Sequence, residues 1–325
     1  MIKAVFNVHP YAFELPGGGE MQIQKYHQNM PSECDIILHD IWHPRLSEAR
    51  IFHHFHMVAG AEGFLSYVKS LRSKVVLSPN LWINASNVEN LDLKQIQRYY
   101  EIADMIVCNS RAEIANLKSF TGIPTEKARV VPNGVDLFFM TPAPEAAFRA
   151  WANIEGPYLL SVGNIERRKN QLGAIRAAKR AKLPLLCIGR IREKDYFDAC
   201  VSEGDSDSFR FLGPLEQKDP KLVAAYQNCE AFVFPSQLET PGIAALEAAA
   251  AGARVLITQE GSASEYFQDH VVYVDPNDQE SIDRGLMRTL GAPRSDELRR
   301  HVVENYSWPH VVMHLLGHYL ELSYE

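Results

Sequence analysis

Short runs of apolar residues alternate with longer stretches of helical period along the whole chain. Because these runs are almost continuously apolar, they predict strands that are buried on both faces of a parallel sheet. In the first half the predicted strands are Ile2–Val8, Asp35–Leu38, Arg50–Phe55, Lys74–Ser78, Met105–Cys108 and Arg129–Val131. In the second half they are Tyr158–Val162, Leu185–Ile188, Phe209–Phe211, Ala231–Phe234, Val255–Ile257 and Val271–Val274.

Helical patterns fit between these strands, for example at Met21–Met30, Gly60–Leu71, Leu93–Ala103 and Arg111–Phe120. Such alternation predicts the α/β class, with parallel sheets covered by helices. Two series of strands predict two Rossmann-like, doubly wound domains, which we expect to face a central cleft. The segment TPAPEAAFRAWANIEGP, rich in Ala and Pro, marks the boundary and gives domains of residues 1–145 and 146–307.

Composition narrows the class of protein. Hydrophobic residues make up 46% and charged residues 22% of the chain, which is ordinary for a globular protein. The net charge of −7 lacks the basic excess of a nucleic-acid-binding protein. Five cysteines without a CxxC pair, and a start without a signal-peptide pattern, lead us to expect a cytoplasmic protein. No apolar run has the length of a transmembrane helix, and peripheral membrane contact stays open.

Ligands of parallel sheets bind beyond the carboxyl ends of the strands, so the loops there are the candidates for chemistry. The first is 15–20, Leu-Pro-Gly-Gly-Gly-Glu, in which glycines permit close backbone approach and a helix N-terminus favours phosphate. A flexible turn is the alternative.

The second candidate loop is 162–170, where Arg167, Arg168 and Lys169 are predicted to open a helix. Cations at that end suggest a bound anion, and a solvated basic turn is the alternative.

The third loop joins the strand Ala231–Phe234 to an Ala-rich helix. Pro241 suits the first turn of that helix, and the amides of Gly242 and Ile243 can face a phosphate. Glu247 lies within the helix, where a buried carboxylate needs hydrogen bonds, from sugar hydroxyls or from the backbone. Glu239 precedes the helix and is placed to reach the ligand; a helix cap with a surface glutamate is the alternative.

Histidines form a fourth group: His39, His43, His53, His54 and His56. His54 and His56 share one face of the predicted strand, a spacing that could serve zinc. Since neither a carboxylate nor a cysteine is obviously placed to complete such a site, we expect no metal. Most of the group reads as structural histidines, and His56, nearest the strand's carboxyl end, is the candidate for a contact with a sugar.

These residues resemble glycosyltransferase family 4, the retaining group 1 enzymes of the GT-B fold. The resemblance rests on the two glutamates of the third loop and the following GARVLITQEGSASEYF, on Asn133–Asp136, on ADMIVCNS, and on the turn from Val162 to Asn170. Tyr306-Ser307-Trp308 is similar to the start of the family's C-terminal helix, which implies that 308–325 joins the first domain.

The resemblance implies specific roles. Lys169, helped by Arg168 after Gly163, would hold the donor diphosphate, and the amides of Gly242 and Ile243 its distal phosphate. Further implied donor contacts are Glu247 to the ribose, Glu239 to the sugar, Gly18 and Gly19 to the diphosphate, and Leu212 and Gly213 to the base. Lys169, Glu239 and His56 are the implied catalytic residues.

Two positions depart from the family pattern. Asn164 stands where many members have arginine, and Pro241 where an aromatic residue is usual.

The expected activity is metal-independent, retaining transfer of a sugar from a nucleotide-diphosphate sugar, UDP- or GDP-linked, to a hydroxyl. The acceptor class stays open among glycans, lipids and small molecules. The alternatives are a sugar-nucleotide epimerase or hydrolase of the same fold, and a non-catalytic nucleotide-sugar-binding protein.

Overall fold

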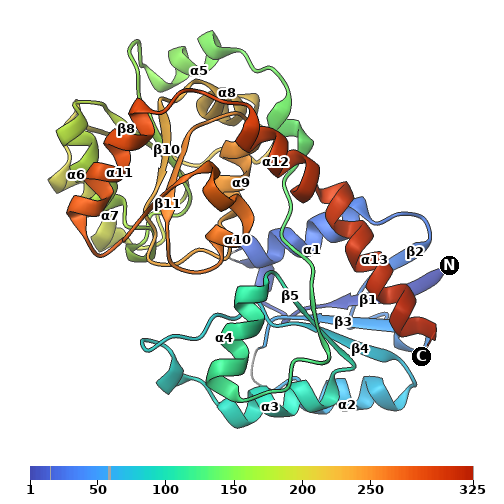
Figure 1. Ribbon diagram of the computed structural model, residues 1–325. Helices are drawn as coiled ribbons and strands as arrows, with labels where there is room; N and C mark the ends of the chain where they lie inside the picture. Colours follow the sequence, from blue (N-terminus) through green and yellow to red (C-terminus); the bar gives the residue numbers. More distant parts are fainter. Residues whose placement is uncertain (15, 58–59, 325) are drawn as a thin grey trace. The chain divides into compact units, whose positions relative to one another are not determined.

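The computed structural model describes residues 1–14, 16–57 and 60–324, and the predicted loop residue Leu15 lies outside them. The chain divides into two compact units (Figure 1). The first unit comprises Met1–Gly134 and Trp308–Glu325, and the second comprises Val135–Ser307. Among the described residues, no helix is long and apolar enough to cross a bilayer.

The first unit is built on a parallel sheet in the order β2-β1-β3-β4-β5-β6. Its strands are β1 (Ile2–Asn7), β2 (Cys34–Leu38), β3 (Ile51–Phe55), β4 (Lys74–Ser78), β5 (Met105–Cys108) and β6 (Ala128–Val130). Its helices are α1 (Gly18–Asn29), α2 (Glu62–Ser70), α3 (Leu93–Ile102), α4 (Arg111–Thr121) and α13 (Trp308–Tyr324).

Alternate residues of each strand supply two cores in this unit. Ala4 and Phe6 pack with Trp308 and residues of α1 and α13, whereas Val5 packs on the opposite face with residues of α2, α3 and α4. Burial on both faces explains why the strands read as continuous apolar runs.

The second unit repeats the plan with a parallel sheet in the order β12-β11-β10-β7-β8-β9. Its strands are β7 (Leu159–Val162), β8 (Leu185–Ile188), β9 (Phe209–Phe211), β10 (Ala231–Phe234), β11 (Val255–Thr258) and β12 (Val272–Val274). Its helices are α5 (Glu145–Ala152), α6 (Gln171–Ala181), α7 (Lys194–Glu203), α8 (Pro220–Asn228), α9 (Ile243–Ala250), α10 (Ala263–Phe267), α11 (Gln279–Gly291) and α12 (Glu297–Tyr306).

Short 3-10 helices occur in the connections of both units: Ala12–Glu14, Leu46–Glu48, Val88–Asn90, Leu137–Met140, Arg167–Lys169 and Gln268–His270. The segment before α5 packs with the second unit, since Val135 and Phe139 are buried in its core.

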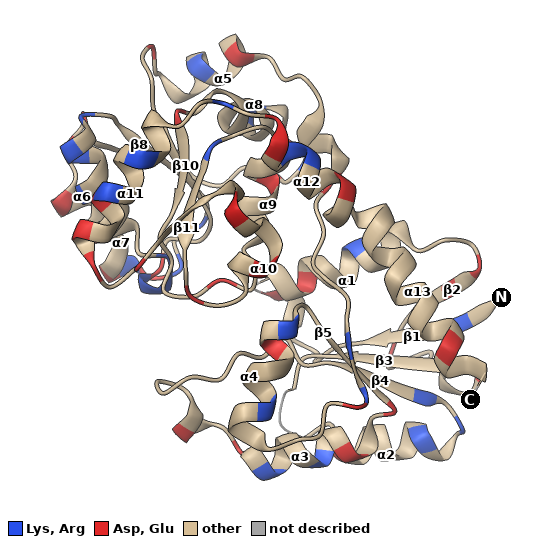
Figure 2. Cartoon of the chain, in the orientation of Figure 1, with Lys and Arg blue, Asp and Glu red and all other residues tan. Residues whose placement is uncertain are grey.

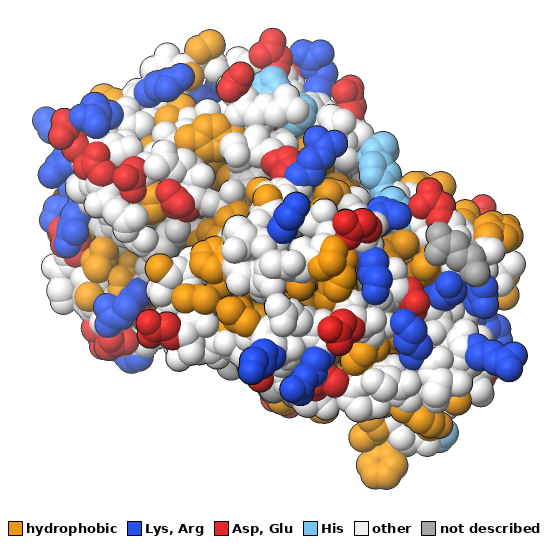
Figure 3. All heavy atoms as spheres, turned by 60° about the horizontal axis from the view of Figure 1, so that its bottom comes forward, with side chains coloured by type: hydrophobic (Ala, Val, Ile, Leu, Met, Phe, Trp, Pro, Cys, Tyr) orange, Lys and Arg blue, Asp and Glu red, His pale blue; other side chains and the backbone are white. Residues whose placement is uncertain are grey.

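The surface is mixed in charge. Acidic and basic residues are interspersed along outer helices such as α11 and α12 (Figure 2), unlike the basic stripe of a nucleic-acid-binding protein. Hydrophobic side chains also reach the surface in patches between the charged ones, as the face drawn in Figure 3 shows.

The predicted fold class is confirmed: every predicted strand is present within a residue of its expected ends. Two helix starts differ from the prediction. The first long helix begins at Gly18 rather than Met21, because the Glu20 carboxylate accepts the Gly17 N–H at 2.7 Å and so completes the helix end. The helix predicted from Gly60 begins at Glu62.

Candidate functional site

In each unit the strand order reverses at one point, and open parallel sheets bind ligands there, beyond the carboxyl ends of the strands. In the second unit this point lies between β7 and β10, which are adjacent in the sheet. In the first unit it lies between β1 and β3. Most of the predicted site residues lie at these two places, whereas Leu212 and Gly213 follow the edge strand β9.

At the switch point of the second unit, Lys169 contacts Glu239, and the predicted residues Gly163 and Gly242 lie beside this pair. Lys169 Nζ lies 2.6 Å from Glu239 Oε1. A Cβ added to Gly163 would meet the Lys169 side chain at 3.7 Å, and one added to Gly242 would lie 3.0 Å from Glu239 Oε2. Phe234, the last residue of β10, lies beneath them, with Lys169 Nζ 4.4 Å from its ring centroid.

Burial shapes the electrostatics of this cluster. The side chains of Lys169 and Glu239 are only 12% and 5% exposed. Burial lowers the pKa of Lys169, because a charged ammonium loses its hydration, and the Glu239 carboxylate opposes that shift. Burial and the Glu239 carboxylate therefore act in opposite directions on the charge of the Lys169 side chain.

The three neighbouring cations have different partners. Arg168 is half exposed; it donates to the Leu238 carbonyl at 3.0 Å and lies 3.7 Å from Glu239. Arg167 instead pairs with Glu193 and Asp195. These carboxylates, and Glu166 beside Arg168 at 3.0 Å, offset the positive charge for which the sequence predicted a bound anion or, as the alternative, a solvated basic turn.

The local backbone corrects two expectations. Arg168 and Lys169 do not open the following helix: they lie in the 3-10 turn Arg167–Lys169, and Asn170 caps α6 by accepting the Gly173 N–H. Pro241 is not in the first turn of α9, because the helix begins at Ile243 and Gly242, with a φ of 89°, lies before it. The N–H groups of Gly242 and Ile243 therefore precede the first hydrogen bonds of α9.

Glu247 lies one turn further along α9 and is 7% exposed. Its Oε2 accepts a hydrogen bond of 2.9 Å from the hydroxyl of fully buried Tyr226, and Gln217 Nε2 lies 3.5 Å from its Oε1. Protein donors therefore hold this carboxylate in place. Tyr226 was not predicted from the sequence, because nothing in a helix pattern marks one buried tyrosine as a hydrogen-bond partner.

The predicted base contacts lie after β9. The Leu212 N–H donates to the Cys187 carbonyl, and the Gly213 carbonyl accepts from Gly189. Both groups are therefore engaged in hydrogen bonds within the fold.

At the switch point of the first unit, His56 lies just beyond β3 with a φ of 71°. Its position after the strand corrects the expectation that it shares a strand face with His54. A Cβ on Gly19 would lie 2.5 Å from His56 Nε2, so only glycine fits there without moving the imidazole. Gly18 is the first residue of α1, directly before it.

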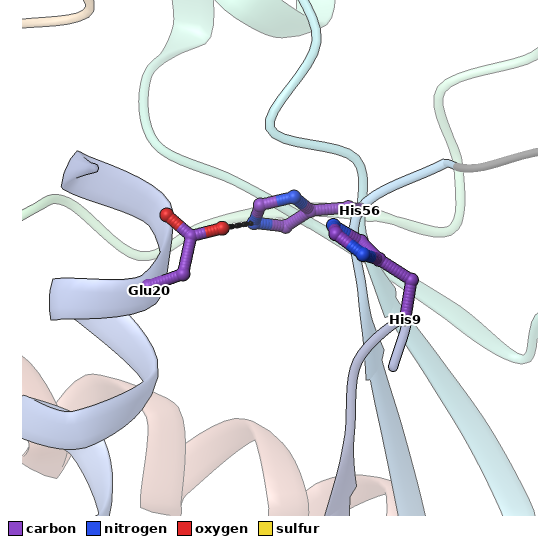
Figure 4. A group of neighbouring side chains, drawn as sticks. All are labelled: His9, Glu20 and His56. Atoms are coloured by element: carbon purple, nitrogen blue, oxygen red, sulfur yellow. Dashed lines mark ion pairs between the residues drawn. The ribbon is translucent and has the colours of Figure 1, made fainter. Parts of the chain in front are cut away.

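Two residues that were not predicted from the sequence, Glu20 and His9, complete this group. Glu20 reaches from α1 toward His56, and His9 lies beside His56, as Figure 4 shows. His56 Nε2 is 3.6 Å from Glu20 Oε1. Burial lowers the pKa of His56, which makes the neutral imidazole the dominant form at pH 7, so this contact is weaker than an ion pair. In the sequence, the signal that could have identified Glu20 was its position directly after three glycines.

Among the described residues, His9, Glu20 and His56 form a group that could hold a metal ion, so the Glu20 carboxylate lies near His56 although the sequence did not obviously place one there. Their ligand atoms lie within 4.8 Å of one another. A tetrahedral zinc ion with bonds of about 2.0–2.1 Å holds its ligands roughly 3.4 Å apart, so this group would have to contract to bind one.

The remaining histidines have identifiable partners. His53 is structural, since its nitrogens contact Tyr319 Oη at 2.5 Å and Ser78 Oγ at 2.8 Å. His43 is exposed beside Asp40. His39 and His54 both contact Asn7, at the end of β1.

Comparison with known proteins shows the family to which the chain belongs. Residues 145–307 match the family described as Glycosyl transferases group 1, and residues 29–138 match Glycosyltransferase Family 4. A D-inositol 3-phosphate glycosyltransferase of Salinispora arenicola is 31% identical over 249 residues, which are 67% of this chain and 55% of the relative. The chain spans about half the length of the curated relatives it matches.

Solved structures share the fold. Sucrose-phosphate synthase from Thermosynechococcus elongatus superposes with a TM-score of 0.75 at 19% identity, covering 98% of both chains. Anabaena Alr3699/HepE, solved in complex with UDP and glucose, gives a TM-score of 0.78 at 14% identity over 98% of this chain and 99% of that one. The chain has the two-unit α/β architecture of the GT-B fold, and the match to Glycosyltransferase Family 4 precedes the match to Glycosyl transferases group 1 along it. The chain therefore belongs to the group 1 glycosyltransferases of family 4.

Proposed function

We propose that this protein transfers a sugar from a nucleotide-diphosphate sugar to an acceptor hydroxyl, with retention of configuration and without a metal ion. The observation that supports this most directly is the cluster of Gly163, Lys169, Glu239 and Gly242. It combines a buried cation, a glycine turn and the N-terminal end of a helix, which together suit a diphosphate.

In this proposal Lys169 and Arg168 stabilise the negative charge that develops on the departing nucleoside diphosphate, the role that a divalent ion has in metal-dependent transferases. The N–H groups of Gly242 and Ile243 meet the distal phosphate. Glu247, held by Tyr226, accepts from the ribose hydroxyls, and Glu239 positions Lys169 and contacts the donor sugar.

The first unit contributes His56 as the proposed contact with the sugar, with Gly18 and Gly19 at the start of α1 as proposed diphosphate contacts. The retaining course is carried over from the family and is part of the proposal. A uridine nucleotide is the first donor to test, because the Anabaena protein was solved with UDP and with UDP-glucose.

A thermal-shift panel of UDP-, GDP-, ADP- and dTDP-sugars, with and without EDTA, tests the donor site. A ligand that binds the native state at 100 times its Kd adds about 2.7 kcal/mol to the free energy of unfolding. We expect one nucleotide family to raise the Tm of the wild type with or without EDTA, and to raise that of Lys169→Ala much less. The absence of a shift with every nucleotide would contradict the proposal.

A second measurement separates transfer from the alternatives. Donor consumption is followed with and without a panel of acceptors. Transfer requires an acceptor-dependent product, whereas consumption at the same rate without any acceptor would indicate a hydrolase or epimerase.

A further inference from the structure

The first unit contains a cavity of about 900 Å³ at the carboxyl ends of β1 and β3, beside α1. It lies at the switch point of that sheet, where a ligand is expected. Its lining includes residues from β1, α1, β3 and the segments after β1 and β2. Asn7, His9, His39, His54 and Phe64 are among the residues of its wall, and Tyr11, Phe13 and Ile41 also line it.

A hydrogen-bond relay fixes one polar group in the wall of this cavity. His39 Nδ1 donates to Asn7 Oδ1 at 2.6 Å, and Asn7 Nδ2 donates to His54 Nδ1 at 2.7 Å. Since His54 Nδ1 accepts, its proton resides on Nε2. This Nε2–H belongs to a side chain that is 98% buried and has no hydrogen-bond partner among the described residues.

An unpartnered buried N–H costs free energy unless a ligand accepts its hydrogen bond. A hydroxyl oxygen is a suitable acceptor for it. His9, whose Nδ1 is also buried without a hydrogen-bond partner among the described residues, connects the cavity to the proposed sugar contact. Its ring centroid lies 5.5 Å from that of His56.

The described residues that line the cavity include no Lys, Arg, Asp or Glu, and their ionisable side chains besides Tyr11 are the histidines His9, His27, His39 and His54. Burial lowers the pKa of His54 to about 4 and also lowers the pKa of His39, so both are neutral at pH 7. A phosphate group placed here would lose its hydration without gaining a cation.

The mouth of the cavity is apolar. Tyr11, Phe13 and Ile41 are 62%, 45% and 69% exposed, an unusual position for large hydrophobic side chains. Phe64, further inside, stacks on His39 with ring centroids 5.4 Å apart. Ligand pockets commonly combine such apolar walls with a few fixed polar groups.

We propose that this cavity binds the acceptor, and that the acceptor is an uncharged molecule with an apolar or aromatic group and a hydroxyl that accepts a hydrogen bond from His54 Nε2–H. The inference rests on the proposed function and adds the acceptor's chemical class. It separates this protein from enzymes whose acceptor is a phosphorylated sugar or polyol, because those need a cation beside the phosphate.

Ligand-observed NMR tests the inference without any transfer reaction. The probes are octyl β-D-glucopyranoside, below the concentration at which it forms micelles, and glucose 6-phosphate, each with and without saturating UDP. We expect the octyl glucoside to bind and glucose 6-phosphate to bind at least tenfold more weakly. Preference for glucose 6-phosphate, or binding of neither probe under either condition, would overturn the proposal.

Variants locate the binding. Ile41→Lys, at the exposed mouth, should weaken octyl glucoside about tenfold and strengthen glucose 6-phosphate, because it brings a cation to an apolar wall. Met287→Lys, on an exposed position of α11, is the matched control and should change neither. His54→Leu should weaken the octyl glucoside about tenfold, whereas His54→Gln, which keeps an N–H, should lose less.

These readouts are independent of the donor site. If nucleotides bind and the octyl glucoside does not, the acceptor inference fails while the proposed function stands. If the octyl glucoside binds this cavity and no nucleotide binds, the proposed function fails instead. Equal loss of binding in Ile41→Lys and Met287→Lys would show that the probe binds elsewhere.

Discussion

Lys169 and Glu239 lie 70 residues apart in the sequence, yet their side chains form a buried pair with 2.6 Å between Nζ and Oε1. The first follows β7 and the second follows β10, and these two strands are neighbours in the sheet. The pair holds the Lys169 side chain at the place where the departing diphosphate is proposed to bind. Preorganised charge of this kind stabilises a transition state without further rearrangement.

Lys169→Ala should therefore lower kcat as well as raise the KM for the donor. We expect kcat to fall about 100- to 1000-fold, since the negative charge that Lys169 meets grows in the transition state. Arg167→Ala is the matched control, because that guanidinium pairs with Glu193 and Asp195 instead. Steady-state kinetics decide the matter: a change in KM alone would remove Lys169 from the chemical step.

Glu239→Gln should change the pH dependence of transfer. Burial lowers the pKa of Lys169 and Glu239 raises it, so loss of the carboxylate should lower that pKa further. The ammonium is then lost at a lower pH, and the alkaline limb of the kcat profile should move toward neutral pH. An unchanged alkaline limb, with kcat reduced at every pH, would show that Glu239 acts on the sugar and not on Lys169.

Gly19→Ala tests the close approach of α1 to the His56 imidazole. The new Cβ would lie 2.5 Å from His56 Nε2, so the ring must move. We expect transfer to fall about tenfold or more, because small displacements of positioning groups are costly in rate. Gly63→Ala is the control, since its Cβ would meet nothing within 4 Å in α2. Equal activity of both variants would argue against a role for the position of His56.

The sequence was sufficient for the strands and for the neighbourhood of Lys169, Glu239 and Gly242, because buried strands and loops at their carboxyl ends follow from apolar periodicity and parallel topology. It was not sufficient to predict which side chains pair with each other. The pairing of Lys169 with Glu239, and of Glu247 with Tyr226, joins residues from different loops and helices, which only the fold brings together.

The sequence also did not predict the backbone conformations that set where two of the helices begin. Asn170 with a φ of 52° and Gly242 with a φ of 89° move the helix starts beyond the basic turn and beyond Pro241. The histidines show the same limit: spacing grouped His54 with His56, whereas the turn at His56 separates their roles. His54 joins the relay through Asn7, and His56 faces Gly19 and Glu20.

Tyr226→Phe should weaken donor binding through Glu247. Its hydroxyl donates to the Glu247 carboxylate at 2.9 Å, and loss of a partner for a buried polar group costs about 1–3 kcal/mol. We expect lower stability in urea and a higher KM for the donor, with kcat nearly unchanged if the ribose contact is made equally in the ground and transition states. Tyr67→Phe, on an exposed residue of α2, is the control. A normal KM in a destabilised Tyr226→Phe would restrict the pair to a structural role.

The stability of the protein should fall as the pH drops from about 6.5 to about 4, and His54 should account for part of the loss. The folded state holds the pKa of His54 at about 4, below the ordinary value of 6.5, because burial disfavours the charged ring. Between these two pKa values His54 is protonated in the unfolded chain but not in the folded chain. The free energy of unfolding therefore rises with pH across this range, and the contribution of His54 is complete above it. The shift corresponds to up to about 3 kcal/mol.

Urea unfolding at pH 7 and pH 4.5 should show a smaller difference for His54→Gln than for the wild type, whereas His43→Gln, at an exposed position, should match the wild type. Parallel losses in all three proteins would mean that His54 is protonated without cost and that its Nε2 lacks the buried, neutral character on which the acceptor site depends.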